Sequence, residues 1–424
     1  MKSVSSLSFL LASALLAACT AGGSGDAPAA GAPVGATEPQ RVVEMFSWWI
    51  APGEVEPLQA IVDLNKKAHP SCRIFNAAAV DAKHAKDTLK SRLASGHPPD
   101  LYQSTASSFR QDLKSGLTSP ASLDDIVART GLQTALFPEV LNDITVDGHA
   151  YLMPVNVHRS NTLFFNKAIF TAHGLTAPKT LAELAATAKK LKDAGVTPFA
   201  MAYQPWILRM MFNEIVLGVM GPETFRAYFT GADASAAALQ KLGEGAEVFR
   251  GLVADYATPD SGNADFGWTD AADLVHDGKA AMYMHGNWVT GYYLALGWAA
   301  GVDFDAVSSP AAPGFFGYEL DVFTKPVGGP NTSSDADDFL ATIASPEGQV
   351  AFARLKGSTP VRFDVPRSTL DSLAKSTLED LETASIRMLI PTADPWDAAI
   401  AQFTKDGVTA ALIKAFTDRP PVTR

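Results

Sequence analysis

Tryptophan residues near glycines and loop segments point to a binding chemistry. Trp48 and Trp49 are adjacent and are soon followed by Glu54, and Trp268 and Trp288 flank a helix-like and a strand-like segment. A flat indole ring stacks on apolar C–H groups while nearby polar groups hydrogen-bond hydroxyls, which is the combination a carbohydrate needs. A single tryptophan is alternatively a core residue. For Trp48 and Trp49 the two interpretations are balanced, because neighbouring side chains of an extended segment point to opposite sides.

Clusters of acidic residues raise the alternative of a secreted hydrolase that cleaves glycans. Such hydrolysis needs two carboxyl groups about 5–10 Å apart around one bond. The clusters occur at expected helix starts or on polar faces, where capping and solvation already account for them. They comprise Asp124, Asp125, Asp335, Asp337, Asp338, Glu379, Asp380 and Glu382. His158 follows a strand-like segment and is open to two interpretations, a structural histidine or a ligand contact.

Composition and motif content argue against several other classes of function. Lys and Arg number 34 against 45 Asp and Glu, and no basic run exceeds two residues, so nucleic-acid binding is not expected. The chain has no CxxC, HExxH or HxH spacing, no phosphate-binding loop and no GxSxG motif. Neither a metal nor a cofactor is therefore expected. The two cysteines are too few for a disulfide framework, and Cys72 is expected to be a buried thiol.

The segments that hold these residues alternate between strand-like and helix-like patterns. Strands are expected at 41–47, 73–76 and 100–103, with helices at 55–65 and 81–94 between them. This order predicts a parallel sheet. The length of 424 residues exceeds one ordinary core. Because the alternation continues beyond these segments, the sequence predicts an α/β protein of two lobes.

Later segments carry signals of individual strands and helices. Residues 151–157 are strand-like, and residues 206–229 have apolar side chains at helical spacing. Thr180 and Glu183 have the pattern of a capping box, and Ser345 followed by proline is expected to start another helix.

The N-terminus has the pattern of a secretory signal. Residues 1–18 combine a positive start at Lys2 with an apolar stretch too short to span a bilayer. Small residues before Cys19 resemble a bacterial lipobox, which implies cleavage before Cys19 and acylation of its thiol. The alternative is an ordinary signal whose cleavage leaves this cysteine unmodified. Residues 19–40 are expected to be a flexible tether, so the patterns predict a periplasmic lipoprotein anchored to a membrane.

Several motifs taken together resemble a known family. In chain order they are Ser47–Trp49 with Gly53 and Glu54, Leu89–Arg92 leading to Gly96–Gln103, Met153–Asn161, Trp268–Ala272, Gly278–Trp288 and Lys356–Arg362. Over about residues 41–420 the chain resembles the extracellular solute-binding proteins of family 1, the sugar receptors of ABC importers. Within that family it looks most like the glucose- or monosaccharide-binding branch.

This resemblance implies a periplasmic-binding-protein fold, in which a hinge joins two α/β lobes and a ligand cleft lies between them. It implies a receptor that binds a small carbohydrate such as glucose, closes around it and delivers it to permease subunits in the inner membrane. The receptor is expected to act as a monomer and without catalysis. Lobe 1 is expected at 41–150 with 304–355, and lobe 2 at 151–303 with 356–424.

The family pattern also implies which residues contact the ligand. Trp48 or Trp49 and Trp288 would stack on the sugar, Trp268 would line the cleft, and His158 would border it. The groups that would hydrogen-bond hydroxyls are Glu54, Gln103, Asn287, Asp321 and Lys356.

Two departures from the family pattern bear on the ligand. The branch often has His or Lys two residues after the position of Gln103, where this chain has Thr105. It also often has a histidine in the C-terminal part, where residues 384–388 contain none. Losing one or two hydroxyl partners, each worth about 1 kcal/mol, would weaken glucose binding or change selectivity. The ligand is therefore open between a monosaccharide and a switched ligand, such as an oligosaccharide or an apolar compound.

Overall fold

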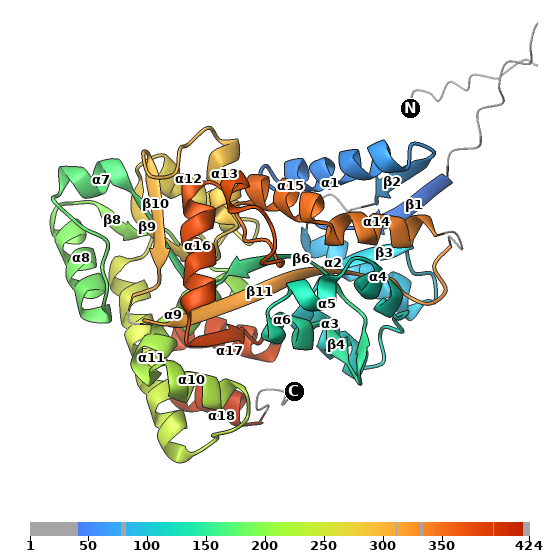
Figure 1. Cartoon of the computed structure of the whole chain (residues 1–424). Helices are drawn as coiled ribbons and strands as arrows, with labels where there is room; N and C mark the ends of the chain where they lie inside the picture. The colour runs from blue at the N-terminus through green and yellow to red at the C-terminus, as the bar shows by residue number, and fades with distance from the viewer. Residues whose placement is uncertain (1–40, 78–81, 311, 331–333, 393, 419–424) are drawn as a thin grey trace, which may run out of the picture. The chain divides into compact units, whose positions relative to one another are not determined.

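The computed structural model describes residues 41–77, 82–310, 312–330, 334–392 and 394–418. The expected signal peptide, Cys19 and the tether lie outside the described residues. Residues 40–424 form one unit by their contacts, and this unit contains every helix and strand drawn in Figure 1.

A six-stranded sheet holds the N-terminal strands together with later ones. Its strands, in spatial order, are β12 (Ile386–Leu389), β11 (Phe315–Thr324), β3 (Leu101–Thr105), β1 (Arg41–Phe46) and β2 (Cys72–Asn76), with β6 (Met153–Arg159) also paired to β11. β1 runs parallel to β2 and β3, which confirms the parallel arrangement predicted from the alternation of strands and helices. β11 runs antiparallel to β3 and β6, so these strands meet at one central strand.

A four-stranded sheet is built from the middle of the chain. Its strands, in spatial order, are β10 (Phe304–Ser308), β7 (Thr162–Asn166), β9 (Ala280–His285) and β8 (Thr197–Phe199). β7 is antiparallel to both of its neighbours, and β8 is parallel to β9. Two short strands, β4 (Thr145–Val146) and β5 (His149–Ala150), form a separate hairpin.

Apolar side chains gather in two main packing clusters, each centred on one of the large sheets, although Phe315, Ile386 and Met388 of the six-stranded sheet belong to the second cluster. The first packing cluster includes residues of α1 (Val55–Ala68), α3 (Ala106–Lys114), α4 (Asp124–Arg129), α5 (Leu132–Ala135), α6 (Pro138–Asp143), α14 (Asp335–Ala344), α15 (Pro346–Lys356) and α16 (Ser372–Thr383). The second includes residues of α7 (Lys167–Ala172), α8 (Leu181–Asp193), α9 (Pro205–Met220), α10 (Pro222–Phe229), α11 (Ala236–Tyr256), α12 (Trp268–His276), α13 (Val289–Ala295), α17 (Asp394–Asp406) and α18 (Thr409–Asp418). On α2 (Ala82–Ala94), Ala85 and Leu89 join a small third cluster.

Packing suggests where the lobes divide. Residues 304–308 form β10 of the four-stranded sheet, whereas the expected division placed them in lobe 1. Helix α16, at residues 372–383, packs in the first cluster, whereas it was expected in lobe 2. We propose that the lobes follow the two packing clusters, because each cluster excludes water around its own sheet.

The chain crosses from one packing cluster to the other at three places near the start of β11. They are the links from β6 to β7, from β10 to β11 and from β12 to α17. The backbone N–H of Ser160 donates to the Gly317 carbonyl, and that of Ile390 donates to the Tyr318 carbonyl. A Cβ on Gly317 would lie 3.0 Å from Ile390 and 3.1 Å from Ser160. Figure 1 shows β11 running from the elements of one cluster into those of the other.

Several helix ends follow the sequence signals. The Thr180 hydroxyl accepts from the Glu183 N–H at the start of α8, and Ser345 caps α15 ahead of a proline, as predicted. The expected helix at 206–229 is divided into α9 and α10, because Gly221 has a φ of 79° and Pro222 begins a new helix. Cys72 is buried, as predicted.

Candidate functional site

Three neighbouring strands of the first sheet bring polar side chains together near the crossings. The side-chain amide of Gln103 on β3 donates to Asp321 on β11 at 3.5 Å. His158 on β6 places Nε2 3.3 Å from the other Asp321 oxygen and Nδ1 2.6 Å from the Asn287 amide oxygen. All four side chains are buried. We call Gln103, His158, Asn287 and Asp321 the Asp321 network; their role as ligand contacts stays a prediction.

The turn after β9 sets the positions of Asn287 and Trp288. The Asn287 N–H donates to the Arg159 carbonyl at 2.8 Å, which fixes this turn to the end of β6. A Cβ on Gly286 would lie only 1.9 Å from the Trp288 ring. Because no larger residue fits there, Gly286 allows the indole to fold back against its own turn. The ring then lies edge-on to His158, with centroids 5.2 Å apart.

Trp288 belongs to a group of aromatic rings around His285. Trp206 lies 5.3 Å and Trp268 6.3 Å from the His285 ring, and Trp288 lies 4.9 Å from it. Burial and the nearby charge of Arg209 lower the pKa of His285 to about 3, so the ring is neutral. Neither ring nitrogen has a hydrogen-bond partner among the described residues. We call Trp206, Trp268, Trp288 and His285 the indole group.

Trp206 was missing from the predicted site. Its ring centroid lies 6.5 Å from that of Trp288, and its side chain is partly exposed. It stands in the first turn of α9, shortly after β8, and its indole N–H donates to Gln204. Its place just after a strand and beside Pro205, a helix-starting residue, was the signal available in the sequence.

Glu54 and Lys356 form a second polar group. The Lys356 ammonium lies 3.1 Å from a Glu54 oxygen, with the lysine side chain 2% exposed and the glutamate 12%. The ammonium is also 5.8 Å from the centre of the Trp49 ring. Ser47 connects this region to the Asp321 network, because its hydroxyl donates to the Gln103 amide oxygen at 2.6 Å and accepts from the Trp49 N–H.

Trp48 and Trp49 lie in different surroundings, in keeping with their alternation along an extended segment. Trp49 is 2% exposed and packs against Phe323 and Phe352 in the first cluster. Trp48 is partly exposed, and the Lys86 ammonium lies 4.8 Å from its ring centre. Of the two indoles, Trp48 has the more accessible face.

A backbone contact beside Lys356 joins elements of the two clusters. A Cβ on Gly291 of α13 would lie 2.6 Å from the Lys356 carbonyl oxygen at the end of α15. A Cβ on Gly53, before α1, would lie 2.5 Å from the Gly291 backbone. We call this meeting of Gly53, Gly291 and Lys356 the glycine contact. It needs glycine because the backbones themselves touch.

A buried ion-paired group lies next to the Asp321 network. Arg209 on α9 places Nε 2.8 Å from Asp397 and Nη1 3.7 Å from Glu319 on β11. Burial alone disfavours the arginine charge, but the two carboxylates outweigh it and raise the pKa of Arg209. Burial raises the pKa of Glu319, while Arg209 opposes that effect.

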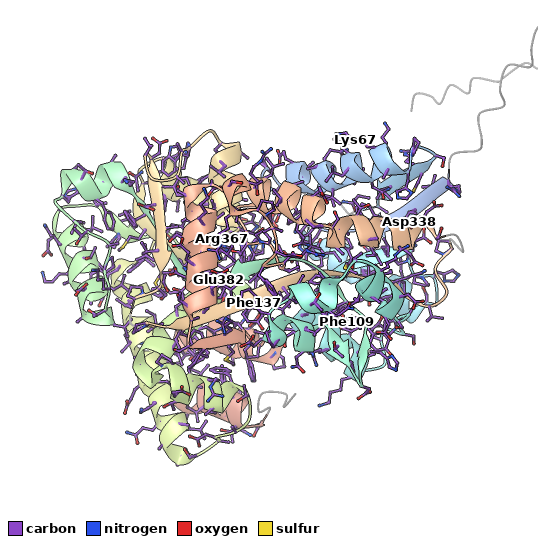
Figure 2. The ribbon with its side chains drawn as sticks, in the orientation of Figure 1. Lys67, Phe109, Phe137, Asp338, Arg367 and Glu382 are labelled. Carbon is purple, nitrogen blue, oxygen red and sulfur yellow. The ribbon has the colours of Figure 1, made fainter. Side chains whose placement is uncertain are left out.

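The acidic clusters considered for hydrolysis are used in other contacts. Asp124 accepts from His149 and the Ala150 N–H, and Asp337 pairs with Lys325. Further ion pairs are Asp335 with Arg41, Asp338 with Arg129, Asp380 with Arg159 and Glu382 with Arg367, the last labelled in Figure 2. None of these six carboxylates belongs to the Asp321 network, so they do not supply a catalytic pair there.

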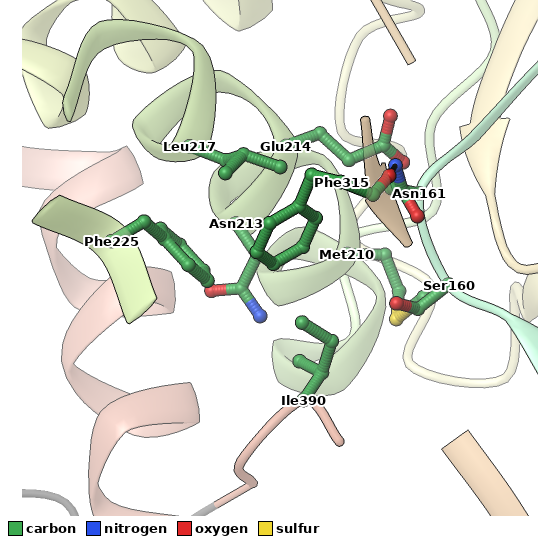
Figure 3. A pocket seen from close by; sticks show the side chains of 9 residues that line it. All are labelled: Ser160, Asn161, Met210, Asn213, Glu214, Leu217, Phe225, Phe315 and Ile390. Atoms are coloured by element: carbon green, nitrogen blue, oxygen red, sulfur yellow. Dashed lines mark hydrogen bonds between the residues drawn. The ribbon is translucent and has the colours of Figure 1, made fainter. Parts of the chain in front are cut away.

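A small cavity lies between α9 and the three crossings, apart from all the predicted ligand contacts (Figure 3). Ser160, Asn161, Phe315 and Ile390 line its crossing side, and Glu214 of α9 lies opposite. Its free space of about 10 Å³ accommodates roughly one water molecule. Glu214 is buried, and neither carboxyl oxygen has a hydrogen-bond partner of normal geometry among the described residues. Burial therefore raises its pKa well above the ordinary value.

Replacing Glu214 by glutamine is expected to stabilise the protein increasingly as pH rises. The folded state holds the Glu214 proton more tightly than the unfolded state, so the wild type loses stability from the unfolded pKa upward. Between the unfolded-state pKa and the raised folded-state pKa of Glu214, the free energy of unfolding of the variant should increase relative to wild type by about 1.4 kcal/mol per pH unit. Denaturant unfolding between pH 4 and pH 8 measures this, with exposed Glu223→Gln as control. A Glu214→Gln advantage that is the same at every pH would contradict the prediction.

The described residues contain neither a metal-ligand cluster nor a helix able to span a membrane. No three His, Cys, Asp or Glu side chains group there as metal ligands would. None of the helices in that part of the chain combines the length and apolarity needed to cross a bilayer.

Comparison with known proteins identifies the family. Residues 59–378 match the model of the bacterial extracellular solute-binding proteins. An uncharacterized ABC transporter extracellular-binding protein of Pyrococcus horikoshii is 31% identical over 94% of this chain and 90% of its own. A probable sugar-binding periplasmic protein of Brucella suis is 28% identical over 84% of this chain and 83% of its own.

The fold agrees with solved structures of solute receptors. The bacterial receptor AcbH, described as exclusive for β-D-galactopyranose, superposes with a TM-score of 0.76 at 17% identity, covering 89% of this chain and 97% of its own. This likeness confirms the predicted two-lobed α/β fold. The chain is a member of the bacterial extracellular solute-binding protein family.

Proposed function

We propose that this chain is the receptor of an ABC importer for a small neutral carbohydrate, with a monosaccharide such as glucose as the leading ligand. The observation that carries the proposal is the Asp321 network edged by the Trp288 ring. Its amide, imidazole and carboxylate groups both donate and accept hydrogen bonds, as hydroxyl groups require. Trp288 supplies the flat apolar surface for the C–H face of a sugar ring.

The charges around this site support a neutral ligand. Glu54 is paired with Lys356, Asp321 lies beside His158, and Arg209 lies beside the Glu319 and Asp397 carboxylates. A charged ligand would leave one of these buried groups or its own charge unmatched, which is unfavourable in a site shielded from water. The names of the relatives, a probable sugar-binding protein and a galactose receptor, support the carbohydrate class.

The proposed cycle involves binding and lobe closure without chemistry. The carboxylates near the site have cationic partners or lie beside His158, which suits binding better than proton transfer to a glycosidic bond. Closure would present the loaded receptor to a permease in the inner membrane. We further propose that the protein acts as a periplasmic monomer, held at a membrane by a lipid on Cys19.

A longer carbohydrate is the second candidate. Trp206 extends the aromatic surface beyond Trp288, with ring centroids 6.5 Å apart. Two neighbouring indoles can stack on two successive sugar units. This arrangement favours an oligosaccharide over the apolar ligand that the sequence also left open.

A thermal-shift panel of monosaccharides, disaccharides, sugar acids and lipids tests the proposal. A ligand at a hundredfold excess over its Kd adds about 2.7 kcal/mol of stability, so Tm should rise by several degrees with glucose or a close epimer. A rise only with longer sugars would favour the second candidate. A rise only with lipids, or turnover of a chromogenic glycoside, would contradict the proposal.

A further inference from the structure

Glu319 is placed by β11 directly beside the Asp321 network. It lies two residues before Asp321 on the same strand, so the two carboxylates project from the same face of the sheet. Burial raises the pKa of Glu319, and the charges of Arg209, Asp321, His158 and Lys86 also act on that pKa. The Glu319 carboxylate therefore lies near charged groups of the Asp321 network. The Glu319 side chain is 16% exposed, close to the 12% of Asp321 and Glu54.

Arg209 approaches Glu319 from the other cluster. It comes from α9, and its charge also reaches His285 at the centre of the indole group. The Arg209–Glu319 pair therefore lies between the Asp321 network and the indole group, the two surfaces proposed to hold the sugar. Neither Arg209 nor Glu319 belongs to the predicted set of ligand contacts.

Arg209 and Glu319 each leave a buried polar atom without a hydrogen-bond partner among the described residues. Arg209 Nη1 and Glu319 Oε1 are 3.7 Å apart, beyond normal hydrogen-bond length, and neither atom has a hydrogen-bond partner among the described residues. One N–H donor and one carboxylate acceptor are thus left side by side in a buried place. A hydroxyl group satisfies both, because its oxygen accepts from the guanidinium while its proton is donated to the carboxylate.

We propose that Arg209 and Glu319 contact the ligand and bind one of its hydroxyl groups, so that they determine which sugar is accepted. This inference rests on the proposed function and extends the set of contacts. Asp397 holds the Arg209 guanidinium at Nε, which leaves Nη1 directed to Glu319. A sugar acid is disfavoured here, because its carboxylate would meet two carboxylates around a single arginine. An amino sugar is disfavoured by the Arg209 charge.

Binding of deoxy sugars to variants of this pair tests the proposal. The probes are glucose, galactose and mannose, each with its 2-, 3-, 4- and 6-deoxy derivatives, titrated against the purified protein by calorimetry. Glu319→Gln should weaken the parent sugar about tenfold or more, since hydrogen bonds to charged groups are strong. The variant should also lose most of the wild type's discrimination against one deoxy sugar, the one that lacks the bound hydroxyl.

Two further variants separate contact from structure. Arg209→Lys keeps the charge but moves the N–H groups, and it should reduce discrimination at the same hydroxyl position. Glu382→Gln, on α16, removes the carboxylate that pairs with Arg367 (Figure 2) and should leave affinity unchanged. Melting curves of all variants establish that they are folded, and Glu319→Asp replaces Glu319→Gln should the latter fail to fold.

The possible results lead to different conclusions. Discrimination lost at one hydroxyl position in both variants supports the inference. Wild-type affinity in a folded Glu319 variant, or an equal loss for every deoxy sugar, overturns the inference and leaves the proposed function standing. Failure of the wild type to bind any carbohydrate in the thermal-shift panel overturns the proposed function and, with it, this inference.

Discussion

Replacing Trp288 by alanine is expected to lower carbohydrate affinity by at least about 100-fold. The change removes the ring proposed to stack on the sugar, and buried aromatic anchors of this kind carry about 2 kcal/mol or more of binding energy. It also removes the edge contact to His158, whose Nδ1 is bonded to Asn287 in the Asp321 network. Stacking and hydrogen bonding should therefore weaken together. Calorimetric titration with the sugar that gives the largest thermal shift measures the loss.

A matched indole elsewhere provides the control for this prediction. Trp298 packs on His276, Tyr293 and Phe304 in the second cluster, and none of these three rings belongs to the Asp321 network or the indole group. Trp298→Ala should reduce stability while leaving affinity unchanged. Trp288→Phe should recover part of the lost affinity, because a flat ring remains. Trp288→Ala with wild-type affinity would remove this residue from the site.

Replacing Gly291 by alanine is expected to prevent tight closure of the two lobes. The added Cβ would lie 2.6 Å from the Lys356 carbonyl oxygen and 2.8 Å from its carbon, closer than such atoms approach. Backbone atoms at the glycine contact cannot rotate away as a side chain can, so α13 and α15 must separate. We expect affinity to fall at least about tenfold, while overpacking lowers stability by about 1–3 kcal/mol.

Gly251→Ala on α11 is the matched control, since a Cβ there meets nothing within 4 Å. That variant should gain up to about 1 kcal/mol from helix propensity and bind normally. Small-angle scattering with and without ligand then measures closure in Gly291→Ala. If the variant becomes as compact as the wild type when ligand is added, the glycine contact is not needed for lobe closure and the prediction is wrong.

Local features of the fold were predictable from the sequence because they depend on neighbouring residues. The parallel order of β1, β2 and β3 follows from short alternating segments, and the Thr180 cap depends on a spacing of three residues. Four of the predicted ligand contacts meet in the Asp321 network. They were identified through family motifs, since Gln103, His158 and Asp321 lie on strands that pair only through long-range contacts.

Other parts of the site could not be inferred from local patterns. Arg209 and Glu214 are the charged residues of the mostly apolar helix α9, where the local sequence gives no hint of what either side chain contacts. Glu319 and Asp397 reach Arg209 only because the chain crosses between the sheets. Residues 206–229 divide at Gly221 because a positive φ and a following proline end α9, which apolar spacing alone does not reveal.

The position of β11 in the chain also has a consequence for the order of folding. β11 pairs with β3, β6 and β12, yet it starts at residue 315, and β12 ends at residue 389. A nascent chain therefore lacks the central strand of its first sheet until most of its length has been made. Pairings between such distant segments form slowly, because closing a large loop costs conformational entropy before the contacts that stabilise the pairing are made. The six-stranded sheet should consequently be completed only after residue 389 is available, later than the four-stranded sheet, whose strands all lie before residue 309.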